Sequence, residues 1–386
     1  MAKNTLERYP RQAIPRRSGR DAMIAGVEGT LADFLAGQVG TLEAVDPELG
    51  SFAGISRDLV LRGGKRLRPT FAYWGWRGLV GADHPIEPVL PALATLELMH
   101  TFALVHDDVM DCSATRRGAP TAHRTFAAEH ARDRRQGDSE HFGAASAILV
   151  GDLCLIWADQ LLARTPVDTA TLFAVRACYD RMRMEAVAGQ YLDVLGETRP
   201  DDWSVEQALR VARYKTASYT VQRPLQFGMT LAGPDPSAGS DGRALADVDA
   251  AYRRYGETVG EAFQLRDDLL GVYGDPAVTG KPAGDDLRTG KPTVLLMLAR
   301  QLASPAQRKE LTTDTAGAVI PADGSGGPRL ARLADVIADT GAPQRVEAMI
   351  RERVDEGVTA VMNAPIHPDA RRALTDLAVT ASHRPA

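Results

Sequence analysis

Cysteine is scarce in this chain of 386 residues, which has only Cys112, Cys154 and Cys178. Three scattered thiols are too few for a disulfide framework, so the small disulfide-rich secreted proteins are excluded. A reducing compartment, the cytoplasm, is therefore the expected location. An excess of basic charge is also lacking. Because the net charge is −5, we expect no nucleic-acid partner.

Long apolar runs are lacking too, since no stretch reaches the roughly 20 apolar residues that a membrane-spanning helix needs. The best candidate, AASAILVGDLCLIW, is short and is interrupted by Asp152. The first twenty residues are basic, but no apolar segment follows Arg16 and Arg17, as it would in a secretion signal. We therefore expect a flexible basic arm over residues 1–20 and no transmembrane segment.

The dominant hydrophobic period is helical, and no segment shows sustained two-residue alternation. No internal repeat is found either. The sequence predicts an all-α chain, with a single domain over residues 21–386. The segments with helical spacing are 89–111, 143–163, 168–195, 204–232, 244–273, 292–303, 328–362 and 367–381. The predicted loops, rich in glycine, proline and charge, are 113–121, 129–142, 233–243, 274–291 and 314–328.

Three carboxylates end the first of these helices, in LVHDDVMD. Positions four apart differ by about 40° of rotation, so Asp107 and Asp111 share a helix face and Asp108 flanks it. Such carboxylates repel one another and resist burial, and a helix C-terminus favours cations. A solvated helix end leaves this conflict unexplained. A divalent cation such as Mg²⁺ would resolve it.

A second acidic pair, in FQLRDDLLGVYGD, also ends an apolar helix. Asp267 and Asp268 follow Gln264 there, about 160 residues after the first cluster. If the two clusters face each other across a cavity, they would hold cations and a polyanion between them.

Cationic residues are concentrated in several short motifs. LRGGKRLRP contains Lys65, Arg66 and Arg68, and the loop after the first acidic cluster contains Arg116 and Arg117. Further candidates are Lys215 in RYKTASYT, Lys281 in TGKPAGDD and Lys291 in RTGKPT. Guanidinium groups suit multidentate binding of diphosphate. Since one diphosphate needs fewer donors, two anionic substrates are expected, one bridged by Mg²⁺ and one held directly by Lys and Arg.

Nucleotide chemistry is not indicated, because neither a P-loop nor G-x-G-x-x-G occurs. Instead, the motifs from about Gly63 to Thr293 follow a known order. They are GGKRLRP, LELMHTFALVHDDVMD, RRGAPTAH, GD at 151–152, EAVAGQYLD, YKTASYT, FQLRDDLLGVYGD and GKPAGDDLRTGKPT. With them the chain resembles the trans-isoprenyl diphosphate synthases, also called the polyprenyl synthetase family.

The resemblance implies an all-α isoprenoid synthase bundle around a deep central cavity, a homodimer, and three Mg²⁺ ions when substrate is bound. It also implies head-to-tail elongation. An allylic diphosphate loses its diphosphate, and the double bond of isopentenyl diphosphate attacks the allylic cation.

Site residues follow from the resemblance by position. Asp107, Asp111 and Asp267 are expected to bind Mg²⁺, with Asp108 in support. Isopentenyl diphosphate is expected to be held by Lys65, Arg68, His100 and Arg117. The allylic diphosphate is expected to be held by Arg116, Lys215 and Lys281. Thr216, Gln264 and Lys291 are expected near the reacting centre, whereas His106 and His123 are expected to be structural.

One position departs from the family pattern. An acid usually lies four residues after the first Asp of the second motif, and here that position is Gly271. The exact metal geometry is therefore open, with Asp268 or a water as candidate replacements.

Product length is expected to depend on the helix that carries Asp107. Phe102, five residues earlier, lies roughly 7.5 Å along the helix and is followed by Ala103. In the family, a single aromatic at the deeper position goes with geranylgeranyl diphosphate. Ordinary core packing of Phe102 is the alternative.

Other activities remain open at this point. Farnesyl or longer-chain synthases are the main alternatives for the product. A class I terpene cyclase would need only one diphosphate site, and a non-catalytic subunit tends to lose its acidic motifs. Neither the pathway served nor the preferred allylic starter follows from the residues.

Overall fold

The structure is a computed structural model that describes residues 19–199, 202–233, 242–275, 284–313 and 327–382. Contacts between Cα atoms divide these residues into two compact units. The N-terminal unit contains residues 19–179 and 224–233, and the C-terminal unit contains residues 180–223 and 242–382. The boundaries fall within helices α7 and α9, and the single domain expected over 21–386 stays a prediction.

The N-terminal unit is helical except for a short ribbon. Its elements are α1 (Gly19–Val45), α2 (Leu49–Leu61), α3 (Leu67–Val80), the 3₁₀-helix η2 (Glu87–Val89), α4 (Leu90–Met110), β1 (Thr115–Arg116), β2 (Ala119–Pro120), α5 (Ala122–Arg132), α6 (Ser139–Leu162), the first part of α7 (Thr169–Glu197) and most of α9 (Arg223–Leu231).

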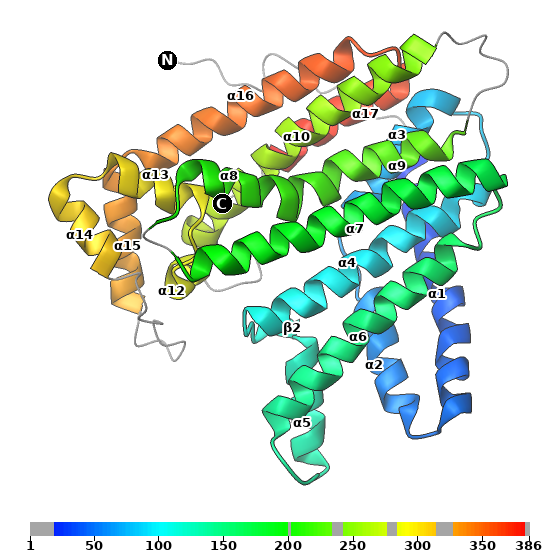
Figure 1. Cartoon of the computed structure of the whole chain (residues 1–386), viewed down its shortest axis with the longest axis horizontal. Coiled ribbons are helices and arrows are strands. Elements are labelled where there is room, and N and C mark those ends of the chain that lie inside the picture. Colours follow the sequence, from blue (N-terminus) through cyan, green and yellow to red (C-terminus); the bar gives the residue numbers. More distant parts are fainter. Residues whose placement is uncertain (1–18, 200–201, 234–241, 276–283, 314–326, 383–386) are drawn as a thin grey trace. The chain divides into compact units, whose positions relative to one another are not determined.

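The core of this unit lies where α4 packs along α6 (Figure 1). Leu93, Leu96 and Met99 of α4 are fully buried, as are Val150 and Cys154 of α6. This spacing of three and four residues is the one that places side chains on one helix face. The packing fixes α4, which carries His100 and the first acidic cluster.

The C-terminal unit is also helical. Its elements are the second part of α7, α8 (Val205–Val211), the π-helix η3 (Ala212–Gln222), α10 (Gly242–Tyr273), α12 (Asp285–Thr289), α13 (Val294–Leu302), α14 (Pro305–Thr313), α15 (Gly327–Asp339), α16 (Ala342–Met362) and α17 (Pro368–Ser382).

Helix α10 is the centre of this unit, and α16 and α17 run beside it (Figure 1). Tyr252 and Tyr255 of α10 are fully buried. The Tyr255 hydroxyl donates a hydrogen bond to the carbonyl of Leu374 on α17, with an O–O distance of 2.7 Å. Burial without such a partner would cost about 1–3 kcal/mol. Helix α10 thereby becomes a rigid support for Asp267 and Asp268 at its end.

The predicted fold class is confirmed, but several boundaries were wrong. Helices α1, α2, α3, α5, α12 and α14 lie outside the helical segments named from the sequence, and α12 lies inside the predicted loop 274–291. The predicted loop 129–142 is shortened by α5 and α6, the loop 113–121 forms an antiparallel two-residue ribbon, and the predicted helix 328–362 is broken between α15 and α16. Gly341, with φ +78°, accounts for that last break.

Two helical segments are long and apolar enough to cross a membrane, Glu87–Met110 and Ser139–Leu162. The expectation that no segment reaches this length and hydropathy was therefore wrong, because a long helix can remain apolar on average although it contains a charge such as Asp152. The most apolar window of each is 56% and 44% buried, respectively. Core helices of soluble proteins can have the same length and apolar composition, so the absence of a transmembrane segment stays a prediction.

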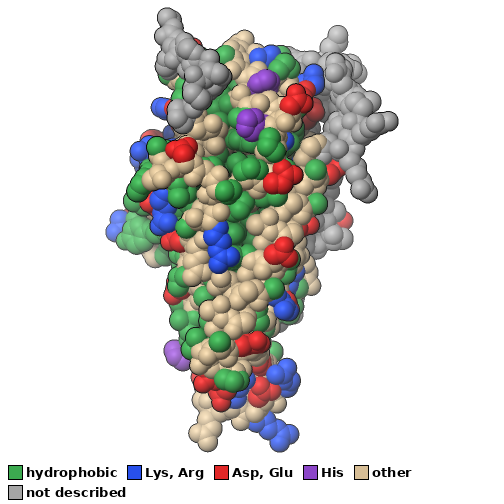
Figure 2. Space-filling view, turned by 90° about the vertical axis from the view of Figure 1, so that its right-hand side faces the viewer, with side chains coloured by type: hydrophobic (Ala, Val, Ile, Leu, Met, Phe, Trp, Pro, Cys, Tyr) green, Lys and Arg blue, Asp and Glu red, His purple; other side chains and the backbone are tan. Residues whose placement is uncertain are grey.

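The molecular face in Figure 2 has charged side chains of both signs interspersed with hydrophobic ones. This mixture agrees with the small net charge of −5. It gives no sign, on that face, of the single-sign surface typical of nucleic-acid binding.

Candidate active site

The N-terminal unit places a buried ion pair behind the motif GGKRLRP. Arg66 has a left-handed backbone conformation, with φ 48°, directly before α3. Its Nη1 atom lies 2.5 Å from Oε2 of Glu97 on α4, and both residues are buried. Arg66 is therefore a support that fixes the start of α3, where Arg68 follows. Sequence reasoning missed Glu97, although an acid inside the apolar run of α4 was a usable signal.

Arg117 reaches the same motif from the β1–β2 ribbon. Its guanidinium donates a hydrogen bond to the carbonyl of Gly63. A Cβ atom on Gly64 would lie 2.9 Å from Nη1 of Arg117, so a larger residue at position 64 would require the end of the Arg117 side chain to shift. The two motifs, which are far apart in the sequence, thus meet in the structure, and their joint role in binding an anion stays a prediction.

Together with His100, these arginines form what we call the basic cluster: Arg66, Arg68, His100, Arg116 and Arg117. Burial, followed by the charges of Arg68, Arg117, Arg116 and Arg66, lowers the pKa of His100 well below its usual range. His100 is therefore neutral at pH 7 and offers one N–H donor. Lys65 is exposed beside the cluster. Such a concentration of positive charge is typical of an anion-binding site.

The first acidic cluster adjoins the basic cluster through Arg116. Nε of Arg116 lies 2.7 Å from Oδ1 of Asp108, and Nη2 lies 3.1 Å from Oδ2 of Asp107. Asp108 is the most buried of the three acids, whereas Asp107 and Asp111 are partly exposed. Asp111 is the residue that follows α4, and its backbone N–H donates to the carbonyl of Asp107 at 2.8 Å, so the two acids lie one helical turn apart, as the predicted spacing requires. The expected contact of Arg116 with an allylic diphosphate stays a prediction.

In the C-terminal unit, a π-helix carries Lys215 and Thr216. Close contacts with α7 and α10 accompany it: a Cβ atom on Gly189 would lie 2.2 Å from the Lys215 nitrogen, and one on Gly260 would lie 2.6 Å from Cα of Ala217. π-Helices are rare, and those that do occur often lie at functional sites. Hydrophobic period alone predicted one helix over 204–232 and did not show this change of pitch.

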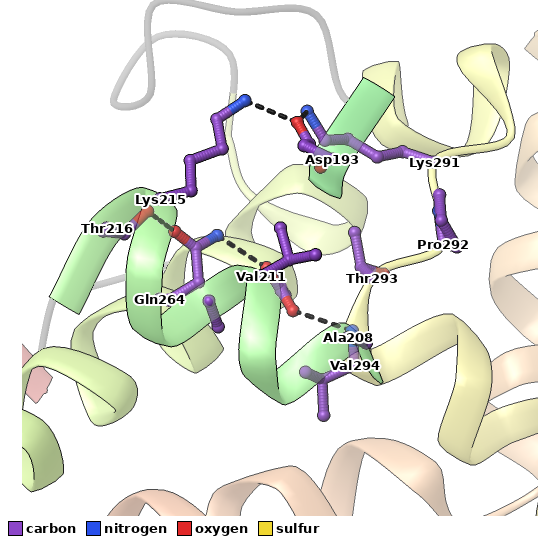
Figure 3. A pocket seen from close by; sticks show the side chains of 12 residues that line it. Asp193, Ala208, Val211, Lys215, Thr216, Gln264, Lys291, Pro292, Thr293 and Val294 are labelled. Atoms are coloured by element: carbon purple, nitrogen blue, oxygen red, sulfur yellow. Dashed lines mark hydrogen bonds and ion pairs between the residues drawn. The ribbon is translucent and has the colours of Figure 1, made fainter. Parts of the chain in front are cut away.

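Lys215 and Lys291 converge on Asp193 of α7 (Figure 3). Their Nζ atoms lie 2.5 Å and 2.8 Å from Oδ2 of Asp193, which is buried. Burial alone would raise the pKa of Asp193, but the charges of Lys291 and Lys215 outweigh it and the pKa lies below its usual range. Asp193 orients both lysines. Sequence reasoning assigned it no role, although it ends the quoted motif EAVAGQYLD.

A chain of hydrogen bonds runs from Thr216 to α13 (Figure 3). Oγ1 of Thr216 donates to Oε1 of Gln264 (2.6 Å), and Nε2 of Gln264 donates to Oδ1 of Asp268 (2.8 Å). Oδ2 of Asp268 accepts from the backbone nitrogen of Val294 (3.1 Å). These residues, with Asp193 and the two lysines, line a cavity of about 70 Å³. The structure thus brings four of the predicted site residues to one cavity: Lys215, Thr216, Gln264 and Lys291.

The remaining predicted residues are placed as follows. Asp267 lies partly exposed on α10, next to the buried Asp268. Burial, with the charges of Asp286 and Asp267, raises the pKa of Asp268 to about 7 despite its hydrogen bonds. Lys281 lies outside the described residues.

Phe102 and Ala103 are partly exposed on α4. The ring of Phe102 lies edge-on to His106, with centroids 4.9 Å apart. Nε2 of His106 in turn lies 2.9 Å from the carbonyl oxygen of Ile148 on α6. A Cβ atom on Gly151 would lie 2.1 Å from that nitrogen, so glycine admits the contact. His106 therefore has a structural contact that orients Phe102.

Within the described part of the chain, no group of three or more His, Cys, Asp or Glu side chains is positioned to hold a metal by itself. The donors at each acidic pair are nevertheless carboxylate oxygens, which are the ligands that Mg²⁺ prefers. Mg²⁺ is usually bound through one or two carboxylates together with substrate phosphates. The residues present fit that mode of binding.

The described part of the chain is almost wholly helical, with acidic pairs at the ends of two helices and cations that converge nearby. The family model described as polyprenyl synthetase matches residues 51–317, and the chain belongs to this family.

Solved and curated relatives agree. A geranylgeranyl pyrophosphate synthase from Corynebacterium glutamicum, complexed with isoprenyl diphosphate and magnesium, is 38% identical, with a TM-score of 0.85 over 95% of this chain and 99% of that one. The geranylfarnesyl diphosphate synthase of Aeropyrum pernix is 32% identical over 81% of this chain and 87% of its own. The geranylgeranyl diphosphate synthase of Mycobacterium tuberculosis is 31% identical over 79% and 77%. Other relatives are farnesyl and octaprenyl synthases, so product names vary.

The basic cluster predicts a pH dependence of stability. Because the folded state lowers the pKa of His100, the unfolded chain binds more protons below pH 6.5, and stability falls as pH falls through that value. We expect wild type to lose about 1 kcal/mol more stability than the His100→Gln variant when the pH falls from 7.5 to 5.5. Urea unfolding at both pH values measures this. The control His141→Gln, on the exposed His141, should behave like wild type. An equal pH dependence in both variants would contradict the prediction.

Proposed function

We propose that the protein is a Mg²⁺-dependent trans-prenyltransferase that condenses isopentenyl diphosphate with an allylic diphosphate to give all-trans geranylgeranyl diphosphate. The observation that carries the proposal is the junction at Arg116. There the basic cluster, which suits an anion without a metal, adjoins carboxylates that suit an anion bridged by a metal. Two diphosphates of different binding mode are what a condensation of this kind requires.

The reaction breaks the allylic C–O bond, and its electron pair leaves with the diphosphate. The double bond of isopentenyl diphosphate attacks the resulting cation, and a proton is lost to the departing diphosphate. Mg²⁺, when bound, neutralises charge on the diphosphate oxygens and improves the leaving group. Asp107, Asp111 and Asp267 would hold it.

The cationic residues bind and orient the substrates. Isopentenyl diphosphate is assigned to Lys65, Arg68, His100 and Arg117. Four of the five members of the basic cluster carry permanent charge, and neutral His100 adds a hydrogen bond without further repulsion. The allylic diphosphate is assigned to Arg116, Lys215 and Lys281, with Thr216, Gln264 and Lys291 near the reacting centre. Asp193 supports this assignment because it holds Lys215 and Lys291 together.

The product assignment rests on Phe102. Its ring is oriented by His106 and so provides a defined surface on α4, next to the small side chain of Ala103. A geranylgeranyl product also agrees with the names of two of the relatives described above. Farnesyl or longer products are the alternative, because relatives with those products exist in the same family.

A cytoplasmic homodimer is part of the proposal. Helix α6 exposes Ile148, Leu149 and Ile156 to 45%, 58% and 54%, and α7 exposes Met184 and Tyr191 to 66% and 67%. Exposed apolar side chains gathered on one helix are typical of a subunit interface. A second copy of the chain would cover them.

The direct test uses the purified protein alone with isopentenyl diphosphate and allylic diphosphates, with and without Mg²⁺. Wild type should elongate the allylic substrate, and Asp107→Ala should lower turnover by several orders of magnitude while remaining folded. The control Asp83→Ala removes an exposed acid elsewhere in the unit and should retain activity. Cyclised products would instead indicate a terpene cyclase, and an inert wild type would indicate a non-catalytic subunit.

The two anion sites are separated by a variant of the basic cluster. Arg68→Gln should raise the KM for isopentenyl diphosphate about tenfold or more, because a charge-assisted hydrogen bond is lost. The KM for the allylic substrate should change much less. Arg57→Gln, which removes a more exposed arginine of α2, is the control. Equal effects on both substrates would refute the assignment.

Product length is tested by changing the surface that Phe102 provides. Phe102→Ala should shift products to longer chains despite the stability lost with the ring, and Ala103→Phe should shift them towards farnesyl diphosphate. Mass spectrometry of the products measures both. Phe126→Ala, which removes a buried ring of α5, controls for general loosening. If neither variant changes the distribution, another element limits the product.

A further inference from the structure

A buried carboxylate of α10, Glu261, is shared by two arginines from neighbouring helices. Oε1 of Glu261 accepts hydrogen bonds from Nε and Nη2 of Arg213, at 2.9 Å and 2.7 Å. Oε2 accepts a hydrogen bond of 2.7 Å from Nε of Arg353 on α16. One oxygen thus binds the π-helix η3, and the other binds α16. The motifs that carry the family resemblance contain none of these three residues.

The π-helix η3 depends on contacts with other elements. It runs over eleven residues, Ala212–Gln222, whereas π-helices mostly occur as single turns. A run of this length therefore needs support from outside to keep its pitch. Lys215 and Thr216, which line the cavity, follow Arg213 within the first five residues of η3. The contact between Arg213 and Glu261 consequently holds the turn that carries both of these side chains.

The close packing of η3 on α10 does not by itself orient this turn. A Cβ atom on Gly260 would lie 2.6 Å from Cα of Ala217, so the two backbones approach closely there. Dispersion contacts of this kind depend strongly on distance and little on direction. Hydrogen bonds do depend on direction, and those between charged groups are the stronger ones.

Two directional contacts therefore determine how the first turn of η3 faces α10. One is the hydrogen bond from Thr216 to Gln264, which lies in the cavity itself. The other is the pair of Arg213 and Glu261, and neither of these residues lines the cavity. The ion pair can thus hold the turn in the same orientation whether or not a ligand occupies the cavity.

The two arginines of Glu261 differ in what their loss would do. An unpaired carboxylate at this buried position would be strongly destabilising, so Glu261 needs at least one of them. Without Arg353, the contact of Arg213 with Oε1 remains, and η3 keeps its support. Without Arg213, Arg353 still neutralises Glu261, but η3 loses its link to α10 at this turn.

We propose that Glu261 is a positioning residue for the allylic diphosphate site. Through Arg213 it holds the first turn of η3, and this places Lys215 and Thr216 at the cavity. Its contact with Arg353 joins α10 to α16 and stabilises the unit without directing the site. The inference rests on the proposed function, which supplies the identity of the ligand.

A matched pair of variants tests the proposal. The readout is the Kd of farnesyl diphosphate in the presence of Mg²⁺, measured by calorimetry without isopentenyl diphosphate, so that no turnover occurs. Arg213→Met should raise this Kd about tenfold, because displacement of Lys215 removes about one charge-assisted hydrogen bond. Arg353→Met should leave the Kd close to that of wild type. Both variants should unfold at lower urea concentrations, since each loses a partner of the same carboxylate.

Conservative and double variants complete the test. Arg213→Lys keeps the charge and should recover most of the lost affinity. Glu261→Met should raise the Kd as Arg213→Met does, and the double variant should be no worse than Glu261→Met alone, because both changes remove the same interaction. In turnover, Arg213→Met should raise the KM for farnesyl diphosphate much more than the KM for isopentenyl diphosphate. Circular dichroism checks that each variant folds, and the two arginine variants decide the test if Glu261→Met does not fold.

Two results would overturn the inference alone. One is a wild-type Kd in the folded Arg213→Met variant. The other is an equal rise of the Kd in the Arg213→Met and Arg353→Met variants, which a network that only stabilises the fold would give. Failure of wild type to bind farnesyl diphosphate in the presence of Mg²⁺ would overturn the proposed function, and the role of Glu261 with it. The behaviour of wild type therefore distinguishes the two failures.

Discussion

The buried pair of Arg66 and Glu97 is the interaction on which the basic cluster of the N-terminal unit depends. Four arginines gather around His100, and their mutual repulsion opposes folding. Glu97 supplies a buried negative charge among them and fixes Arg66 in a left-handed conformation that otherwise costs energy. Breaking a buried pair leaves an uncompensated charge, which is strongly destabilising. The pair therefore keeps Arg68 and His100 in place for an anion that supplies the remaining negative charge.

In the C-terminal unit, too, a buried carboxylate offsets the repulsion between neighbouring cations. One carboxylate, Asp193, lies between Lys215 and Lys291, so the pair of lysines keeps a net positive charge. The close approach that puts Lys215 there needs Gly189, because any Cβ atom would meet the Lys215 backbone at 2.2 Å. The ion pair therefore depends on backbone geometry: Gly189 lets the π-helix approach α7 closely, and this approach brings Lys215 to Asp193.

Much of this was predictable from the sequence, for identifiable reasons. Period and spacing found the long helices and the shared face of Asp107 and Asp111, since both depend only on helix geometry. The order of the motifs singled out Arg117 and Gln264, which in the structure contact Gly63 and Thr216, respectively. Glu97 and Asp193 were missed, because their roles come from partners on other elements and not from spacing along their own helix. The π-helix was missed because its hydrophobic pattern hardly differs from that of an α-helix over eleven residues.

Gly271 shows why a departure from a motif has to be judged in space and not along the chain. Along the chain, Gly271 stands where the family pattern has an acid. In the fold, the carboxyl group of Asp286 lies where a Cβ atom of residue 271 would otherwise be. A Cβ atom at 271 and this placement of Asp286 exclude each other at 2.2 Å. An acid at position 271 would therefore require a different placement of the Asp286 side chain.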